Sequence, residues 1–171
     1  VTTFYVRVPT TQDTDFEGKE DFQLTATITG GKSGSDTSTI VDDGSGKVYD
    51  DKGANPAGPG NDDRSITVAG LDDVSEGSNA IFTVTLGAAS SAVTEISLAW
   101  ANGEGSNDAA ESGDYTVSYS NDGSDASKAA VYYYVGSTQI FLSVTDGKIT
   151  LPANVTTFYV RVPTTQDTDF E

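Results

Sequence analysis

The feature that most constrains this chain is a segment of seventeen residues that occurs twice without a change. VTTFYVRVPTTQDTDFE fills residues 1–17 and returns as residues 155–171, an offset of 154 residues. Two identical copies at this distance indicate a tandem array. A unit of this length is typical of a whole domain rather than of one turn of a solenoid. We therefore expect one domain type repeated along a longer chain, with this sequence opening late in one repeat and closing at the same point of the next.

Composition narrows the chemistry that the chain can carry. It has no Cys and no His, and 26 acidic against 9 basic residues give a formal charge of −17. The lack of Cys excludes disulfides and thiolate sites, and the lack of His removes the commonest general base and transition-metal ligand. Such acidity argues against nucleic acid and anionic membranes as partners, and no apolar run is long enough to span a bilayer. Oxygen ligands remain, which suit calcium.

Alternating β-branched and aromatic residues predict short strands, and no helical pattern appears between them. Seven strands with this spacing are typical of an antiparallel β-sandwich. An insertion at 116–146 holds two further runs, 131–135 and 139–144, around Gly136-Ser137, which predict a hairpin. The seven main strands are expected at 65–69, 80–86, 94–100, 148–151, 155–162 (with its copy at 1–8), 21–28 and 37–41.

The repeat boundary is expected in residues 44–64, which are rich in Gly, Pro, Asn and Asp. Residues 1–43 then hold the last strands of one repeat, and 65–171 hold most of the next. The second unit lacks its own last two strands, so strands equivalent to 21–41 must complete it. They could come from the same chain, because the linker spans roughly 65–70 Å when fully extended, or from a neighbouring chain by strand exchange.

Acidic residues gather in the loops expected at one end of the sandwich. Loops alternate between the two ends of an antiparallel sandwich, and those of the other end, at 87–93, 153–154 and 29–35, contain no acid. Calcium takes six to eight oxygen ligands, so a dense carboxylate rim predicts a calcium site; the alternative is a solvated acidic face. The expected ligands are Asp13, Asp15, Glu17, Glu20, Asp42, Asp43, Asp72, Asp73, Glu76, Asp114 and, in the second copy, Asp167, Asp169 and Glu171.

The same end of the sandwich is where the chain leaves for the next repeat. Calcium would then lie at the joint between neighbouring identical repeats. Without the ion, the linker at 44–64 is expected to be a flexible coil, and with it the joint would stiffen.

Five motifs resemble the Calx-beta domain in the same order along the chain. They are VSEG at 74–77 with AIFTVTL, SGDYT at 112–116, GKITLP at 147–152, the run at 4–28, and TIVDDG at 39–44. The resemblance implies an immunoglobulin-like sandwich with calcium at one end. It implies ligand roles for Glu76, Asp114, Asp13, Glu17, Glu20, Asp42 and Asp43. Gln12 departs from the family, which often has Asp there, and the insertion before Lys148 is longer than usual.

Acidic, Cys-free and identical tandem copies look most like the extender region of giant bacterial RTX adhesins. The resemblance implies a structural spacer without catalysis, secreted by a type I system and anchored to the outer membrane. Such spacers hold a ligand-binding tip away from the cell surface.

Two other functions compete with this interpretation. One is a calcium-dependent module that binds glycans or surfaces, for which the aromatic residues of the insertion are candidates: Tyr132, Tyr133, Tyr134 and Phe141. The other is a glycosidase with paired carboxylates. The density of the acids favours calcium over such a pair.

Overall fold

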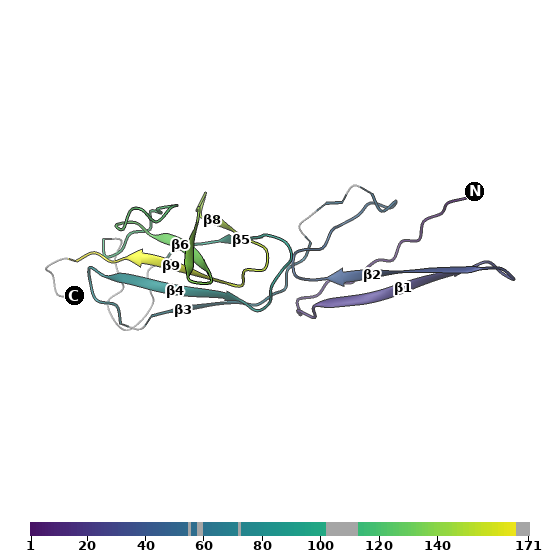
Figure 1. The fold of residues 1–171 in the computed structure, drawn as a ribbon, viewed down its shortest axis with the longest axis horizontal. Helices are drawn as coiled ribbons and strands as arrows, with labels where there is room; N and C mark the ends of the chain where they lie inside the picture. The colour runs from purple at the N-terminus through teal and green to yellow at the C-terminus, as the bar shows by residue number, and fades with distance from the viewer. Residues whose placement is uncertain (55, 58–59, 72, 102–112, 167–171) are drawn as a thin grey trace. The chain divides into compact units, whose positions relative to one another are not determined.

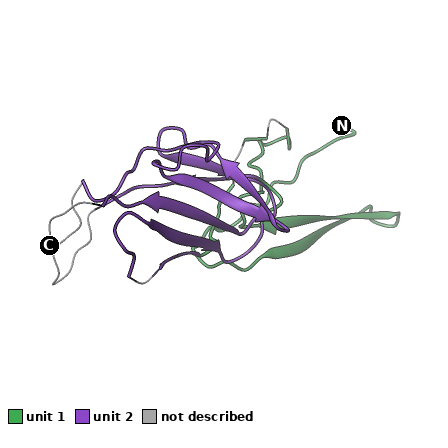
Figure 2. Ribbon diagram, turned by 60° about the vertical axis from the view of Figure 1, so that its left-hand side comes forward, with its two compact units in different colours: residues 1–65, 90–92 green, residues 66–89, 93–171 purple. Residues whose placement is uncertain are grey.

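The computed structural model describes residues 1–171 except 55, 58–59, 72, 102–112 and 167–171, and it divides into two compact units (Figure 1, Figure 2). In the described residues all regular structure is β and the named strands pair antiparallel, which confirms the predicted fold class. These residues include no helix with the length and apolarity to cross a membrane. The strands are β1 (Lys19–Thr27), β2 (Ser33–Val41), β3 (Ile66–Gly70), β4 (Asn79–Leu86), β5 (Thr94–Ser97), β6 (Ala130–Val135), β7 (Thr138–Leu142), β8 (Lys148–Leu151) and β9 (Thr157–Pro163).

Unit 2, residues 66–89 and 93–171, contains the hydrophobic core. Its larger sheet has the order β3-β4-β9-β6-β7. The strands β5 and β8 form a second sheet (Figure 1). Alternate residues of β9 point inward because side chains on a strand alternate between its faces. Phe158, Val160 and Val162 are buried on that face, and the core continues to Ile96 and Ile149 of the smaller sheet. The two sheets therefore share one core, as in a β-sandwich.

The predicted hairpin of the insertion forms, and it belongs to the larger sheet. β6 pairs with β7 on one side and with β9 on the other, where Ala130 is opposite Arg161 and Tyr132 is opposite Tyr159. The strand expected at 94–100 ends earlier, at Ser97. Trp100 lies just beyond it, partly buried against the core, and its Nε1 donates a hydrogen bond of 2.8 Å to the hydroxyl of Tyr119.

Unit 1, residues 1–65 and 90–92, is built on the hairpin of β1 and β2. Its register places Glu20 opposite Ile40 and Leu24 opposite Asp36. The predicted strand at 37–41 is longer in the structure, beginning at Ser33. The hairpin is a two-stranded sheet of its own. The seven-strand, immunoglobulin-like order, which needs these two strands within the sandwich, stays a prediction.

The two copies of the repeated segment have different structures. Residues 157–163 form β9 between two partner strands, whereas residues 1–8 have no regular structure and are exposed. The prediction of a strand at 1–8 was wrong. A strand is held by hydrogen bonds to its neighbours, and this copy pairs with none of the described strands.

The linker is more ordered than its composition predicts. Asp43 forms a β-bridge with Asp62 and Val48 forms one with Ala57, so the segment folds back on itself. Asp62 also holds Arg64, whose Nη2 lies 2.6 Å from the Asp62 Oδ2. Backbone pairing thus closes the loop in the described part of 44–64, while the flexibility of the linker without metal stays a prediction.

Candidate metal centre

Three segments of unit 2 meet at one end of its larger sheet. The turn at 75–78 is tied to Thr164, whose Oγ1 accepts a hydrogen bond of 3.1 Å from the Ser78 backbone N–H. The next residue, Thr165, donates its backbone N–H to the carbonyl oxygen of Asp114 at 2.7 Å. These bonds bring together the chain around Glu76, Asp114 and the residues that follow β9. The antiparallel alternation of loops predicts this convergence.

Gly77 allows the closest of these approaches. Its φ is +70°, a backbone conformation that residues other than glycine adopt only with strain. A Cβ at this position would also lie 3.0 Å from the Cβ of Gln166. The turn carrying Glu76 is thus packed against the residue that precedes Asp167. Asp73, with φ of 26°, is in the loop that follows β3. The expected ligands Asp72, Asp167, Asp169 and Glu171 lie outside the described residues.

In unit 1 the acidic segment meets the residue that follows β2. Asp42 Oδ2 accepts hydrogen bonds from the backbone N–H of Glu17 at 2.6 Å and of Gly18 at 3.3 Å. Asp13 Oδ1 accepts another from the backbone N–H of Asp15 at 3.0 Å. The two expected groups of ligands, 13–20 and 42–43, are therefore in contact, although they are far apart in sequence.

The charge of this cluster is not balanced. The pKa of Glu17 is raised, first by the charge of Glu20 and then by Asp13, by burial, and by Asp15 and Asp42. The second oxygen of Asp42, Oδ1, is buried without a hydrogen-bond partner in the described structure. A buried acceptor without a partner is costly, and a cation would satisfy it and relieve the repulsion around Glu17. These oxygen-only ligands fit a hard cation such as calcium.

Asp43 has different surroundings from its neighbour Asp42. Burial acts to raise its pKa, but hydrogen bonds from the hydroxyl and backbone N–H of Ser45 and the charges of Arg64 and Lys19 outweigh burial, so its pKa is lowered. The carboxylate is already compensated by protein groups. Asp43 therefore holds the folded linker, and sequence pattern alone did not reveal this role of Ser45 and Arg64.

A complete metal cage is not assembled within the described part of the chain. No group of three or more acidic side chains there has the geometry to hold an ion. The acids of 13–20 and 42 share an electrostatic field, while Glu76 and Asp114 belong to the other unit. That these acids form one ligand set within a complete repeat stays a prediction.

The aromatic residues of the insertion pack mainly on one another. Tyr132 stacks on Tyr159 with 5.6 Å between ring centroids and makes edge contacts with Tyr134 and Phe141 at 5.8 Å each. Tyr133, on the opposite face of β6, packs against the core. This cluster has the geometry of ordinary aromatic packing on a sheet, and Tyr134 is its exposed member.

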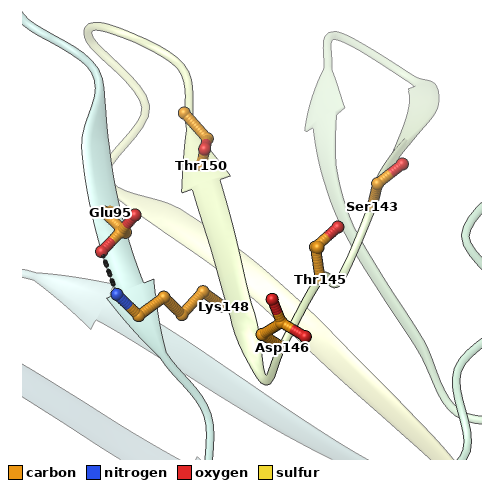
Figure 3. A pocket seen from close by; sticks show the side chains of 6 residues that line it. All are labelled: Glu95, Ser143, Thr145, Asp146, Lys148 and Thr150. Atoms are coloured by element: carbon orange, nitrogen blue, oxygen red, sulfur yellow. Dashed lines mark hydrogen bonds and ion pairs between the residues drawn. The ribbon is translucent and has the colours of Figure 1, made fainter.

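A polar hollow lies beside the smaller sheet (Figure 3). Its walls come from Glu95 of β5, Lys148 and Thr150 of β8, and the loop of Ser143–Asp146. The Lys148 Nζ lies 2.7 Å from the Glu95 Oε1, and this carboxylate raises the pKa of the lysine. Since the pair is exposed and its charges cancel, the hollow has the character of ordinary polar surface.

Comparison with known proteins gives no relative from which a role can be transferred. No family model, no curated protein and no solved structure matches this chain.

Proposed function

We propose that this chain is a calcium-binding structural spacer, an extender repeat of a tandem-repeat adhesin on a bacterial surface. The observation that carries the proposal is the contact between the repeated acidic segment and Asp42. The Glu17 backbone N–H, at the end of the exactly repeated segment, binds one oxygen of Asp42, and the other oxygen of Asp42 is buried without a partner in the described structure. The charges of Glu20, Asp13, Asp15 and Asp42 together raise the pKa of Glu17. In a complete repeat, the ion would be held by Glu17, Glu20 and Asp42 with Asp13 and Asp15, joined by Glu76 and Asp114.

Calcium would contribute charge neutralisation and oxygen coordination at this end of the sandwich. The residues of the chain supply the rest. The bonds of Thr164 and Thr165 fix the turn of Glu76 and the Asp114 backbone, and Asp42 fixes the start of β1. Loops held both by these bonds and by a shared ion would resist bending, which makes the joint to the next repeat stiff.

The spacer function agrees with the exact repetition and the absence of Cys and His. A spacer needs length, which identical copies supply, and it needs no distinct site in each copy. The proposed spacer has no catalytic role. We propose further that the protein is secreted by a type I system, is anchored to the outer membrane outside the cell, and carries its ligand-binding tip elsewhere on the adhesin.

Thermal unfolding of the full chain with calcium and with a chelator tests the proposal. A ligand that binds only the folded state stabilises it by about 2.7 kcal/mol at a hundredfold excess over its Kd, so the melting temperature should rise with calcium concentration. Asp42→Asn should weaken binding measured by titration calorimetry. Asp51→Asn removes the same charge from an exposed ion pair with Arg7 and should bind like the wild type. Equal melting temperatures with no binding heat would reject the calcium site.

A second function, adhesion to glycans or surfaces, is favoured by one observation, the exposure of Tyr134 at the edge of the aromatic cluster. Pull-down on polysaccharide beads would separate it from the spacer. Retention that disappears in Tyr134→Ala would establish adhesion. Tyr133 is unsuitable for this test, since its loss would disturb the core.

A further inference from the structure

Four acidic residues meet where the linker pairs with the end of β2. Asp43 forms a β-bridge with Asp62, and the Asp63 N–H donates to the Asp42 carbonyl oxygen at 2.9 Å. Like charges that lie directly opposite each other in an antiparallel pair destabilise it. The bridge of Asp43 with Asp62 therefore depends on a positive charge that compensates both carboxylates.

Arg64 supplies such a charge. Its Nε donates to Asp62 Oδ1 at 2.8 Å and its Nη2 to Asp62 Oδ2 at 2.6 Å, the two-pronged arrangement in which ion-pair hydrogen bonds are strong. The side chain of Arg64 is only 1% exposed, so salt and water screen the pair little. Burial acts to raise the pKa of Asp43, and hydrogen bonds from Ser45 with the charges of Arg64 and Lys19 lower it. The guanidinium thus acts on both opposed carboxylates.

The carboxylate that Arg64 binds also lies against the segment that follows β2. Gly44 has a φ of +76°, and a Cβ at this position would lie 3.1 Å from Asp62 Oδ2. Hydrophobic burial contributes little to closing the linker, since Val48 and Tyr49 are 63% and 58% exposed. Closure of the linker therefore depends on its backbone hydrogen bonds and on the charge balance around Arg64.

The closed bridge fixes the position of Asp42. The Asp42 carbonyl oxygen is held by Asp63 of the linker, and its Oδ2 accepts hydrogen bonds from the backbone N–H groups of Glu17 and Gly18. Its other carboxylate oxygen, Oδ1, is buried without a partner in the described structure. Opening the bridge would remove the hydrogen bond that holds the Asp42 backbone on the linker side.

We infer that Arg64 is a positioning residue of the proposed calcium site. By balancing the charges of Asp43 and Asp62 it keeps the bridge closed, and the closed bridge holds Asp42 in place for the ion. Arg64 itself does not bind calcium, because a guanidinium has no acceptor to offer a cation. The inference rests on the proposed calcium-binding function and adds the residue through which the linker acts on the site.

The sign of the effect of Arg64→Gln on calcium affinity tests this role. A positive charge near a cation site opposes binding, so loss of the charge alone would tighten binding. Loss of positioning acts in the opposite direction, and residues that orient metal ligands typically change affinity by about 10–100-fold. Titration calorimetry of the full chain should therefore show weaker calcium binding in Arg64→Gln by roughly this factor. Arg64→Lys keeps the charge without the two-pronged hydrogen bonds and should recover part of the affinity.

Two further variants separate charge balance from general damage. Arg7→Gln removes the same charge from an exposed ion pair with Asp51, and its calcium affinity should not fall. Adding Asp62→Asn to Arg64→Gln removes one of the two opposed carboxylates, so it should restore part of the lost affinity. Amide hydrogen exchange at Asp63 reports the bridge itself. It should be faster in Arg64→Gln than in the wild type, and slower again in the double variant.

The outcomes distinguish this inference from the proposed function. A wild-type chain that binds no calcium would reject the calcium site and the positioning role together. A wild type that binds calcium while Arg64→Gln binds it equally well or more tightly would overturn the positioning role and leave the proposed function in place. Unchanged exchange at Asp63 in Arg64→Gln would also overturn the role, because the bridge would then close without the guanidinium.

Discussion

Asp42 and Asp43 are neighbours of identical chemistry, and the fold gives them different roles. Hydrogen bonds from Ser45 and the positive charge of Arg64 stabilise the carboxylate of Asp43. Asp42, in contrast, has a buried oxygen without a partner among the described residues, and its other oxygen binds the Glu17 backbone N–H. The sequence pattern placed both in one ligand set. It could not distinguish them, because the compensating Arg64 approaches through the backbone pairing of the linker.

Glu17 gives a pH prediction at this scale. In chelator its pKa should lie above its ordinary value of 4.5, because its acidic neighbours disfavour the charged form. Stability linked to the neutral carboxyl is then present below pH 4.5 and is lost as the pH rises through the folded pKa. Calcium favours the charged form, so it should lower the pKa. Carbon NMR of the carboxyl, assigned with Glu17→Gln, measures both states.

Two observations would contradict this account of Glu17. One is a pKa at or below 4.5 in chelator, which would remove the repulsion. The other is a pKa that does not move when calcium is added, which would separate Glu17 from the ion.

At the scale of elements, the repeated segment shows how far local sequence determines a strand. Residues 1–8 and 155–162 are identical, yet only the second copy lies in a sheet, between β4 and β6. The alternation of the sequence puts Phe158, Val160 and Val162 on one face of β9, and all three are buried. It could not predict that the first copy lacks a partner strand in the described structure, nor that the inserted hairpin pairs with β9, since both depend on distant segments.

The two copies supply a matched pair of substitutions. Phe158 is fully buried and Phe4 is 74% exposed. Phe158→Ala should lower the free energy of unfolding by about 3–5 kcal/mol, because it removes a core ring and leaves a cavity. Phe4→Ala should change it by less than about 0.5 kcal/mol. Denaturant titration measures both, and equal losses would show that either copy can occupy the position of β9.

At the scale of the whole molecule, the sequence predicted more of the architecture than of the site. Strand spacing and the lack of helical patterns identified the all-β antiparallel fold, and loop alternation placed Glu76, Asp114 and the segment after β9 at one end. The expected ligand set stays a prediction, since its described members are divided between two units and Asp72, Asp167, Asp169 and Glu171 lie outside the described residues. The backbone pairing within the linker could not be predicted either, because its Gly and Pro content indicates turns without showing which segments pair.

The central claim is that calcium stiffens a string of these repeats. Small-angle X-ray scattering from a chain of three consecutive 154-residue repeats, in calcium and in chelator, measures it most directly. Ions at the joints should hold neighbouring repeats in a fixed direction, so the account predicts a larger maximum dimension and a rod-like scattering profile in calcium, with a shorter, flexible chain in chelator. The same maximum dimension and the same profile in both conditions, at full calcium occupancy, would contradict it.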